Sequence, residues 1–194
     1  MDEGMEKMKE ICWYGRGGQG AKTAAQLLAE ASLAEGKYIQ AFPEYGPERA
    51  GAPMKAFTRI ADEPINLHCG VNCPQIVVVI DPTLLNLVDV NEIAEKGILL
   101  VNIDKPPFQI RKERFGLFKG KIYTVNATKI ALETVGLPLP NTPMLGALIR
   151  AVEIVPLKSL EEKLKEKFLK KIGEEKTKAN IQGVYRAYKE VVWG

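Results

Sequence analysis

The chain has 194 residues, of which 46% are hydrophobic and 26% are charged, a composition typical of a compact globular protein and not of a disordered one. Its formal net charge of +3 is too small and too evenly spread to indicate a nucleic-acid-binding protein. Residues 1–10 lack the apolar core of a secretory signal, and no segment approaches the roughly 20 apolar residues of a membrane span. With an odd number of cysteines, three, these features predict a cytoplasmic protein with free thiols.

The first elements in chain order are a short strand, a glycine-rich turn and a helix. Apolar residues 11–14 precede the sequence Gly-Arg-Gly-Gly-Gln-Gly at positions 15–20, and the Ala/Leu-rich segment 21–35 has the spacing of an amphipathic helix. Gly36 then supplies a glycine cap. Three of the glycines in the turn fit the G-x-G-x-x-G spacing that brings backbone N–H groups and a helix N-terminus to an anion. The turn is therefore the first candidate binding site.

The candidate site residues in this turn are Gly15, Arg16, Gly17, Gly18, Gln19 and Gly20. A tight turn that binds nothing is an equally good interpretation of the glycines alone. The amide of Gln19 favours a binding role, because it can hydrogen-bond a ligand or a neighbouring chain. Lys22 opposes the positive end of the helix dipole, and a nearby anion would relieve this conflict. A dinucleotide is disfavoured, because the next predicted strand, 38–42, ends without the acidic side chain that holds the ribose.

The middle of the chain begins with an irregular segment. Residues 41–53 contain three prolines and two glycines, so we expect a long loop with a functional role. Within it, Glu48 and Arg49 form an adjacent pair of opposite charges, for which a solvated surface pair is the first interpretation. Two short apolar runs about a turn, 54–60 and 65–68, then predict a β-hairpin.

Strands and helices alternate through much of the remaining chain. Buried strands are predicted at 75–80, 98–102 and 121–125, and helices from Asp81-Pro82, at 128–135, at 142–153, at 159–171 and at 177–191. This order predicts an α/β fold with a mainly parallel, Rossmann-like sheet sandwiched between helices, together with the β-hairpin and a helical C-terminal tail. We expect one domain over residues 1–194, with a helical appendage from about residue 156.

Most familiar catalytic arrangements are missing from the sequence. The single histidine, His68, has no nucleophile motif beside it, so a catalytic triad is not indicated. His68, Cys69 and Cys73 lack a fourth ligand and do not match common zinc spacings. Three cysteines are also too few for the usual four-cysteine iron–sulfur cluster. We therefore predict no catalytic residue and no metal ligand in this chain.

Several long motifs, in this order, resemble the gamma subunit of 2-oxoacid:ferredoxin oxidoreductases, especially of the pyruvate:ferredoxin enzyme. They are GRGGQGAKTAAQLLAEA at 15–31, GKYIQAFPEYGPERAGAPMKAFTRI at 36–60, VVVIDPTLL at 77–85, ILLVN at 98–102 and NTPMLGALIR at 141–150. The resemblance runs from about Ile11 to Val155. It implies a soluble complex that oxidatively decarboxylates a 2-oxoacid with coenzyme A, giving acyl-CoA, carbon dioxide and reduced ferredoxin.

The resemblance also implies which subunits of that complex bind the cofactors. Thiamine diphosphate with magnesium, and 4Fe-4S clusters, belong to the alpha, beta and delta subunits, while the gamma chain binds none of them and is not catalytic alone. Residues 15–20, and also Arg49, are implied as contacts of coenzyme A or of another subunit. The substrate is pyruvate, or alternatively 2-oxoisovalerate or another 2-oxoacid with a shared gamma subunit. A stand-alone nucleotide-binding dehydrogenase and a purely structural scaffold remain as further alternatives.

Overall fold

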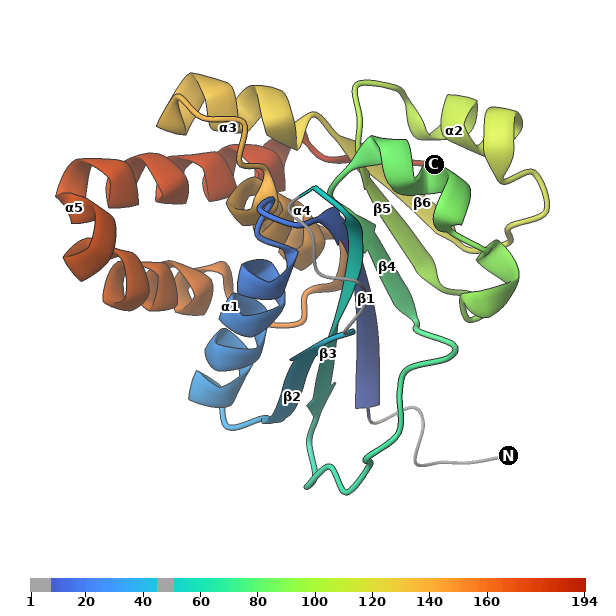
Figure 1. Ribbon diagram of the computed structural model, residues 1–194, viewed down its shortest axis with the longest axis horizontal. Coiled ribbons are helices and arrows are strands. Elements are labelled where there is room, and N and C mark those ends of the chain that lie inside the picture. The colour runs from blue at the N-terminus through green and yellow to red at the C-terminus, as the bar shows by residue number, and fades with distance from the viewer. Residues whose placement is uncertain (1–7, 45–50) are drawn as a thin grey trace.

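A single sheet runs through the centre of the molecule in the computed structural model, which describes residues 8–44 and 51–194 (Figure 1). Its strands are β1 (Met8–Arg16), β2 (Tyr38–Pro43), β3 (Pro53–Ala61), β4 (Ile76–Val79), β5 (Ile98–Asn102), β6 (Lys121–Val125) and β7 (Val192–Trp193). Their order across the sheet is β2-β3-β1-β4-β5-β6-β7. Strands β1, β4, β5 and β6 are parallel, whereas β3 pairs antiparallel with β1 and β2, and β7 pairs antiparallel with β6.

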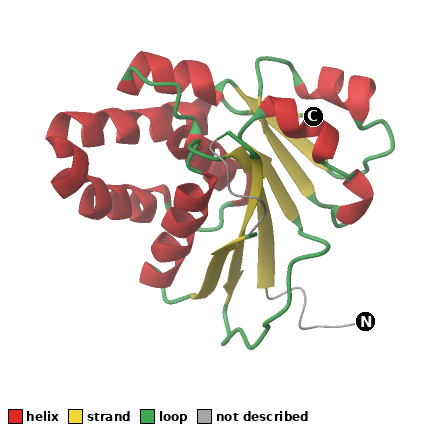
Figure 2. Cartoon of the chain, viewed as in Figure 1, coloured by secondary structure: helices red, strands yellow, loops and turns green. Residues whose placement is uncertain are grey.

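Helices cover both faces of this sheet (Figure 2). On one face lie α1 (Ala21–Ala34), α3 (Ala127–Val135), α4 (Asn141–Val152) and α5 (Leu157–Glu190). On the other lie α2 (Pro107–Arg114) and the 3-10 helices η1 (Pro82–Leu87) and η2 (Val90–Glu92). The predicted fold class, a mainly parallel sheet between helices, is confirmed. None of the helices in the described part of the chain combines the length and hydropathy that a membrane crossing requires.

Consecutive side chains of β1 belong to two separate hydrophobic cores. Ile11 and Trp13 pack on the face covered by α1, α4 and α5, while Cys12 and Tyr14 pack on the face covered by η1 and α2. Successive side chains of a strand point to opposite faces, so a strand covered on both faces has a continuous apolar sequence. The indole Nε1 of Trp13 is also satisfied, because it donates to Oγ1 of Thr58 at 3.0 Å.

The long C-terminal helix α5 is broken at Gly173, whose φ of 81° and ψ of 172° are not helical. Figure 1 shows the two parts of α5 folding back on each other at the left of the view. The break separates the two helices that the sequence predicts at 159–171 and 177–191. The second part packs closely on α4, where a Cβ on Gly146 would lie 2.0 Å from the carbonyl oxygen of Val184.

The predicted hairpin between residues 54–60 and 65–68 is wrong. Residues 54–60 lie in β3, but β3 pairs with β1 and β2, and residues 65–68 form no strand. This segment is largely exposed and is held against β2 by Gln40, whose Nε2 donates to the carbonyl oxygen of Leu67 at 2.9 Å. The antiparallel partners of β3 are thus the earlier strands β1 and β2.

Smaller differences concern short elements. The helix predicted from Asp81-Pro82 is the 3-10 helix η1, and Asp81 caps it as expected, since its side chain accepts a hydrogen bond from the backbone N–H of Thr83. Helix α2 and strand β7 are not predicted from the sequence. Both are short, and β7 contains only two residues, too few for a recognisable pattern.

Candidate functional site

The glycine turn, residues 15–20, lies at the carboxyl edge of the parallel strands, between the end of β1 and the start of α1. Strands β1 and β4 are parallel neighbours. The chain leaves β1 toward the face covered by α1, but leaves β4 toward the opposite face through η1. Adjacent strands whose connections diverge in this way form the usual ligand-binding position of α/β sheets. Residues 15–20 therefore lie at a position where α/β sheets commonly bind ligands, whereas Arg49 lies outside the described residues.

Backbone conformation and close packing account for three of the glycines. Gly18 and Gly20 have positive φ angles, 95° and 81°. A Cβ on Gly20 would lie 2.6 Å from Nδ2 of Asn141 in α4, and one on Gly15 would lie 3.0 Å from Cβ of Ala21. Gly18 differs, because a Cβ there would have no heavy atom of the described residues within 4 Å. An added side chain at Gly18 would thus not clash with the described part of the chain.

A carboxylate from the neighbouring strand end connects the glycine turn to the rest of the sheet. Asp81 follows β4 and is only 7% exposed. Its Oδ2 accepts a hydrogen bond from Nε2 of Gln19 at 2.7 Å and lies 3.2 Å from Nε of Arg16. Its Oδ1 accepts hydrogen bonds from the backbone N of Thr83 at 2.9 Å and from Thr83 Oγ1 at 2.7 Å.

This environment keeps Asp81 charged. Burial alone would raise the pKa of its carboxyl, but the hydrogen bonds from Thr83 and Gln19, with the positive charge of Arg16, outweigh burial and lower the pKa. A charged carboxylate therefore stands beside the turn at neutral pH.

Arg16 completes this polar cluster and supplies its cation. Its Nη2 donates to Oγ1 of Thr83 at 2.8 Å, and its Nη1 donates to the carbonyl oxygen of Gly51 at 3.1 Å. Its backbone N donates to Oε1 of Gln19 at 2.8 Å. The Arg16 side chain is still 34% exposed, so an anion arriving from solvent can reach the guanidinium.

The end of the predicted irregular loop lies against the same turn. The backbone N of Gly17 donates to the carbonyl oxygen of Ala52 at 3.0 Å, and the backbone N of Gly51 donates to that of Gly17 at 3.2 Å. Residues 51 and 52 are thus tied to the glycine turn at this edge of the sheet. Glu48 and Arg49 lie outside the described residues.

The sheet order argues against a dinucleotide site at the glycine turn. In dinucleotide-binding folds the strand after the first helix lies beside β1 and ends in the acid that holds the ribose. Here the strand after α1 is β2, and β3 lies between β2 and β1. The end of β2 is therefore displaced from the turn by a whole strand. The turn suits an anionic group without the ribose contact.

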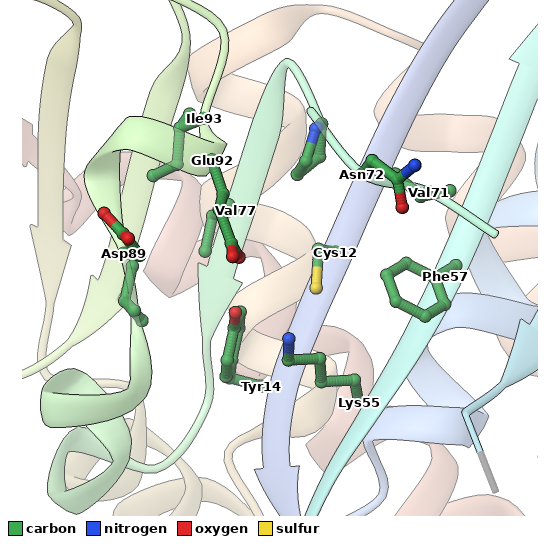
Figure 3. Close-up of a pocket in the computed structure, with 12 residues that line it drawn as sticks. Cys12, Tyr14, Lys55, Phe57, Val71, Asn72, Val77, Asp89, Glu92 and Ile93 are labelled. Atoms are coloured by element: carbon green, nitrogen blue, oxygen red, sulfur yellow. The ribbon is translucent and has the colours of Figure 1, made fainter.

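A second cluster of ionisable side chains lies on the face of β1 that is turned away from α1 (Figure 3). Cys12 and Tyr14 point toward Lys55 of β3, and Glu92 of η2 faces them. The strand register places Tyr14 opposite Lys55, whose Nζ lies 5.0 Å from the centroid of the Tyr14 ring. The pocket between these side chains has a volume of about 20 Å³, room for roughly one water molecule.

The groups in this small pocket are not activated. Burial raises the pKa of Cys12 to about 12, and burial is also the largest cause of the raised pKa of Tyr14. Burial, the largest single effect on Lys55, would lower its pKa, but the hydrogen bond to Tyr14 and the charge interactions with Tyr14, Cys12 and Glu44 together outweigh burial and raise the pKa. At neutral pH the thiol and the phenol are neutral and the amine is charged, so the pocket offers no nucleophile. We interpret it as part of the packing between β1 and β3.

The remaining histidine and cysteine positions show no ligand cluster. In the chain outside residues 1–7 and 45–50, no three His, Cys, Asp or Glu side chains lie close enough together to hold a metal ion. Cys12 is buried, whereas Cys69 and Cys73 are exposed, and all three are free thiols. The nearest polar contact of Cys69 is with the guanidinium of Arg59, at 3.9 Å from Sγ.

Sequence patterns identify the glycine turn but not its partners. Asp81 is recognised only as a helix cap, and Thr83 carries no signal of its own. The useful signal is position, because an acidic residue directly after a buried strand lies at the carboxyl edge, where β1 also ends. Tyr14 and Lys55 could not be paired without the strand register.

The chain was compared with family models, with curated proteins and with solved structures. Residues 10–190 match the family described as pyruvate ferredoxin/flavodoxin oxidoreductase. The chain is 52% identical over 186 residues to pyruvate synthase subunit PorC of Thermotoga maritima, covering 96% of each chain. It is 49% identical to the pyruvate/ketoisovalerate oxidoreductases common subunit gamma of Thermococcus kodakarensis, covering 89% of this chain and 93% of that one.

The fold agrees with a solved structure as well. The crystal structure of pyruvate oxidoreductase subunit PORC from Thermotoga maritima matches with a TM-score of 0.85 and 49% identity, covering 97% of this chain and 99% of the other. The family resemblance read from the motifs is thereby confirmed along nearly the whole chain. This protein belongs to the pyruvate ferredoxin/flavodoxin oxidoreductase family.

Proposed function

We propose that this chain is the gamma subunit of a pyruvate:ferredoxin oxidoreductase. Such an enzyme converts pyruvate and coenzyme A to acetyl-CoA and carbon dioxide and passes the electrons to ferredoxin. The observation that carries the proposal is the nearly full-length identity to a pyruvate synthase subunit, with the matching fold of its crystal structure.

The proposed partners are the alpha, beta and delta subunits of the same enzyme, with ferredoxin as the electron acceptor. We assign thiamine diphosphate, magnesium and the 4Fe-4S clusters to those subunits, because three cysteines in this chain are fewer than one such cluster needs. Three free cysteines also suit a reducing compartment, so we propose that the complex is cytoplasmic.

Within this complex, we propose that the glycine turn contacts coenzyme A. Coenzyme A carries phosphate groups, and a helix N-terminus beside a reachable guanidinium attracts phosphate. Arg16 supplies that guanidinium, and Gly18 leaves open space in front of the backbone. Arg49, in the adjoining loop, is proposed as a second contact on its charge and sequence position. The bound ligand would be held and oriented by these groups, and no bond in it would be broken by them.

A second candidate is a subunit shared between two enzymes. The relative from Thermococcus kodakarensis is described as common to pyruvate and ketoisovalerate oxidoreductases, and it is nearly as similar to this chain as the pyruvate synthase subunit. In that case the 2-oxoacid would be chosen by partners, while the gamma chain serves both complexes.

Purification of the tagged full chain from its native cell tests the assembly. We expect thiamine- and cluster-bearing subunits to copurify with coenzyme A-dependent pyruvate oxidation, and the chain alone to oxidise no pyruvate. Two sets of partners, with activity on 2-oxoisovalerate as well, would establish the shared subunit. Recovery of an active, thiamine-free chain without partners would refute the assignment.

A matched pair of substitutions tests the coenzyme A contact in the assembled complex. Gly18 and Gly36 are both exposed, have φ of 95° and 78°, and leave a new Cβ without neighbours within 4 Å. Gly18→Ala and Gly36→Ala therefore impose similar backbone strain, but at opposite ends of α1. We expect only Gly18→Ala to raise KM for coenzyme A, by about tenfold, with kcat unchanged. Equal kinetics of the two variants would contradict the contact.

A further inference from the structure

We propose that Asp81 is a positioning residue that holds the glycine turn in its binding conformation through Gln19 and Arg16. The identity of the ligand as coenzyme A rests on the proposed function above, whereas the positioning itself does not. In this role Asp81 does not itself contact the ligand. It acts on the turn from the end of the neighbouring strand β4.

Gln19 bridges Asp81 and the backbone of the turn. Its side-chain amide spans the turn, because Oε1 accepts from the backbone N of Arg16 at 2.8 Å while Nε2 donates to Asp81 Oδ2 at 2.7 Å. An amide has one donating and one accepting end, so a carboxylate on one side decides which end faces the backbone. The charged oxygen of Asp81 thus orients the Gln19 amide and, through it, the start of the turn.

Asp89 caps η2 in the same way that Asp81 caps η1. Oδ1 of Asp89 accepts from the backbone N of Asn91 at 2.9 Å and from Asn91 Nδ2 at 2.8 Å. Capping therefore occupies one carboxylate oxygen in both residues. Asp89 is exposed, but Asp81 is buried and directs its second oxygen to the glycine turn. That second oxygen performs a task that capping does not require.

An amide in place of the Asp81 carboxylate cannot accept all of the hydrogen bonds that the carboxylate accepts. In Asp81→Asn the side chain keeps its size, but either the amide NH₂ faces Nε2 of Gln19 and Nε of Arg16, or it faces the donors of Thr83. Donors facing donors at a nearly buried position leave hydrogen bonds unmade. The variant therefore loosens either the glycine turn or the cap of η1. Only loosening of the turn would speed hydrogen exchange at the backbone amides of the turn.

Hydrogen exchange of the full chain tests the positioning. The backbone N–H groups of Gly17 and Gln19 are bonded within this region, to Ala52 and Arg16. We expect these two amides to exchange about tenfold faster in Asp81→Asn, the loss of one hydrogen bond. Asp89→Asn, the capping control, should leave them unchanged.

A swap variant provides the rescue. Gln19→Glu combined with Asp81→Asn restores one donor and one acceptor between the two positions and keeps the net charge, so protection of the turn should return. Equal exchange rates of the turn amides in Asp81→Asn and Asp89→Asn would overturn the proposal. A swap variant that restores no protection would also overturn it, because a change at residue 19 can compensate for the loss of Asp81 only if the two side chains interact.

Kinetics of the assembled complex separate this inference from the proposed function. With coenzyme A as the ligand, Asp81→Asn should raise its KM by about tenfold and leave kcat and the KM for pyruvate within about twofold. Faster exchange with an unchanged KM for coenzyme A would support the positioning and refute the coenzyme A contact. A raised KM in Gly18→Ala, with Asp81→Asn behaving like Asp89→Asn in both assays, would keep the contact and refute the positioning.

Discussion

The buried environment of Cys12 makes its thiol unreactive. Because burial raises its pKa to about 12, almost no thiolate exists at pH 8, and the side chain is also shielded from reagents. We expect a thiol reagent at pH 8 to modify Cys69 and Cys73 in the folded chain and Cys12 only after unfolding. Peptide mapping by mass spectrometry distinguishes the three sites. Modification of Cys12 in the folded chain as fast as Cys69 would contradict this.

Asp81 leads to a prediction about acid stability. Its pKa in the folded chain lies below the usual value of 3.8, so its hydrogen bonds stabilise the fold fully above that pH. This stabilisation is lost as the pH falls below 3.8 and passes through the lower folded pKa. The difference in unfolding free energy between the native chain and Asp81→Asn, measured by urea unfolding, should therefore shrink as the pH falls below about 4. A difference that stays constant as the pH falls below about 4 would refute the prediction.

Among single residues, the sequence predicts those whose role follows from local backbone conformation, but not those whose role depends on a contact with a distant residue. The glycines at 15–20 are visible because their spacing is local. The contact between Gln19 and Asp81 joins positions 62 residues apart, and nothing in either position specifies the other. Strand pairing creates that contact, so it could not be predicted before the sheet order was known.

The close packing of α4 on α5 leads to a prediction at the scale of elements. Alanine in the middle of a helix is favoured over glycine by about 1 kcal/mol, so propensity alone predicts that Gly146→Ala stabilises α4. A Cβ at this position would, however, lie 2.0 Å from the backbone carbonyl oxygen of Val184, which cannot move without displacing α5. Overpacking of this kind costs about 1–3 kcal/mol or more. We therefore expect a net loss of stability.

Thermal unfolding measures this loss, with Gly116→Ala as the control. A Cβ on Gly116 would have no heavy atom within 4 Å, and Gly116 is exposed. For a chain of this length about 1 kcal/mol corresponds to a shift of roughly 2–4 °C in Tm. Gly146→Ala should lower Tm by several degrees while Gly116→Ala changes it little, and a raised Tm for Gly146→Ala would show that α5 yields at no cost.

Elements with strong local patterns were predictable, and those that depend on distant partners were not. The strands at 98–102 and 121–125 occur within the bounds expected for them, since continuous apolar runs between turns mark a buried strand. The hairpin prediction failed because the short apolar run 65–68 forms no strand, and the run 54–60, although it is a strand, does not specify its partner. The structure shows that the backbone hydrogen-bonding groups on the two edges of β3 pair with β1 and with β2.

The whole chain should behave as one cooperative unit. Leu160, Leu164, Val184 and Ala187 of α5 are buried in the same core as the central strand β1. We therefore expect the chain to unfold in a single transition, and a chain ending at residue 156 to lose the folded state, because large apolar surfaces of α1 and α4 would be exposed. Coincident circular dichroism and fluorescence transitions test this. A stable, folded chain without α5 would instead identify a separate appendage.

The position of β1 in the sheet has a consequence for how the protein reaches its fold. β1 is made first and lies between β3 and β4, yet Trp13 meets its partner Thr58 45 residues later, and Glu10 meets Gln75 65 residues later. Contacts of such high sequence separation slow folding, since long loops must close before any pairing is gained. During synthesis the apolar run of β1 therefore stays unpaired until β3 and β4 have both been made, and unpaired apolar strands are prone to aggregation in that interval.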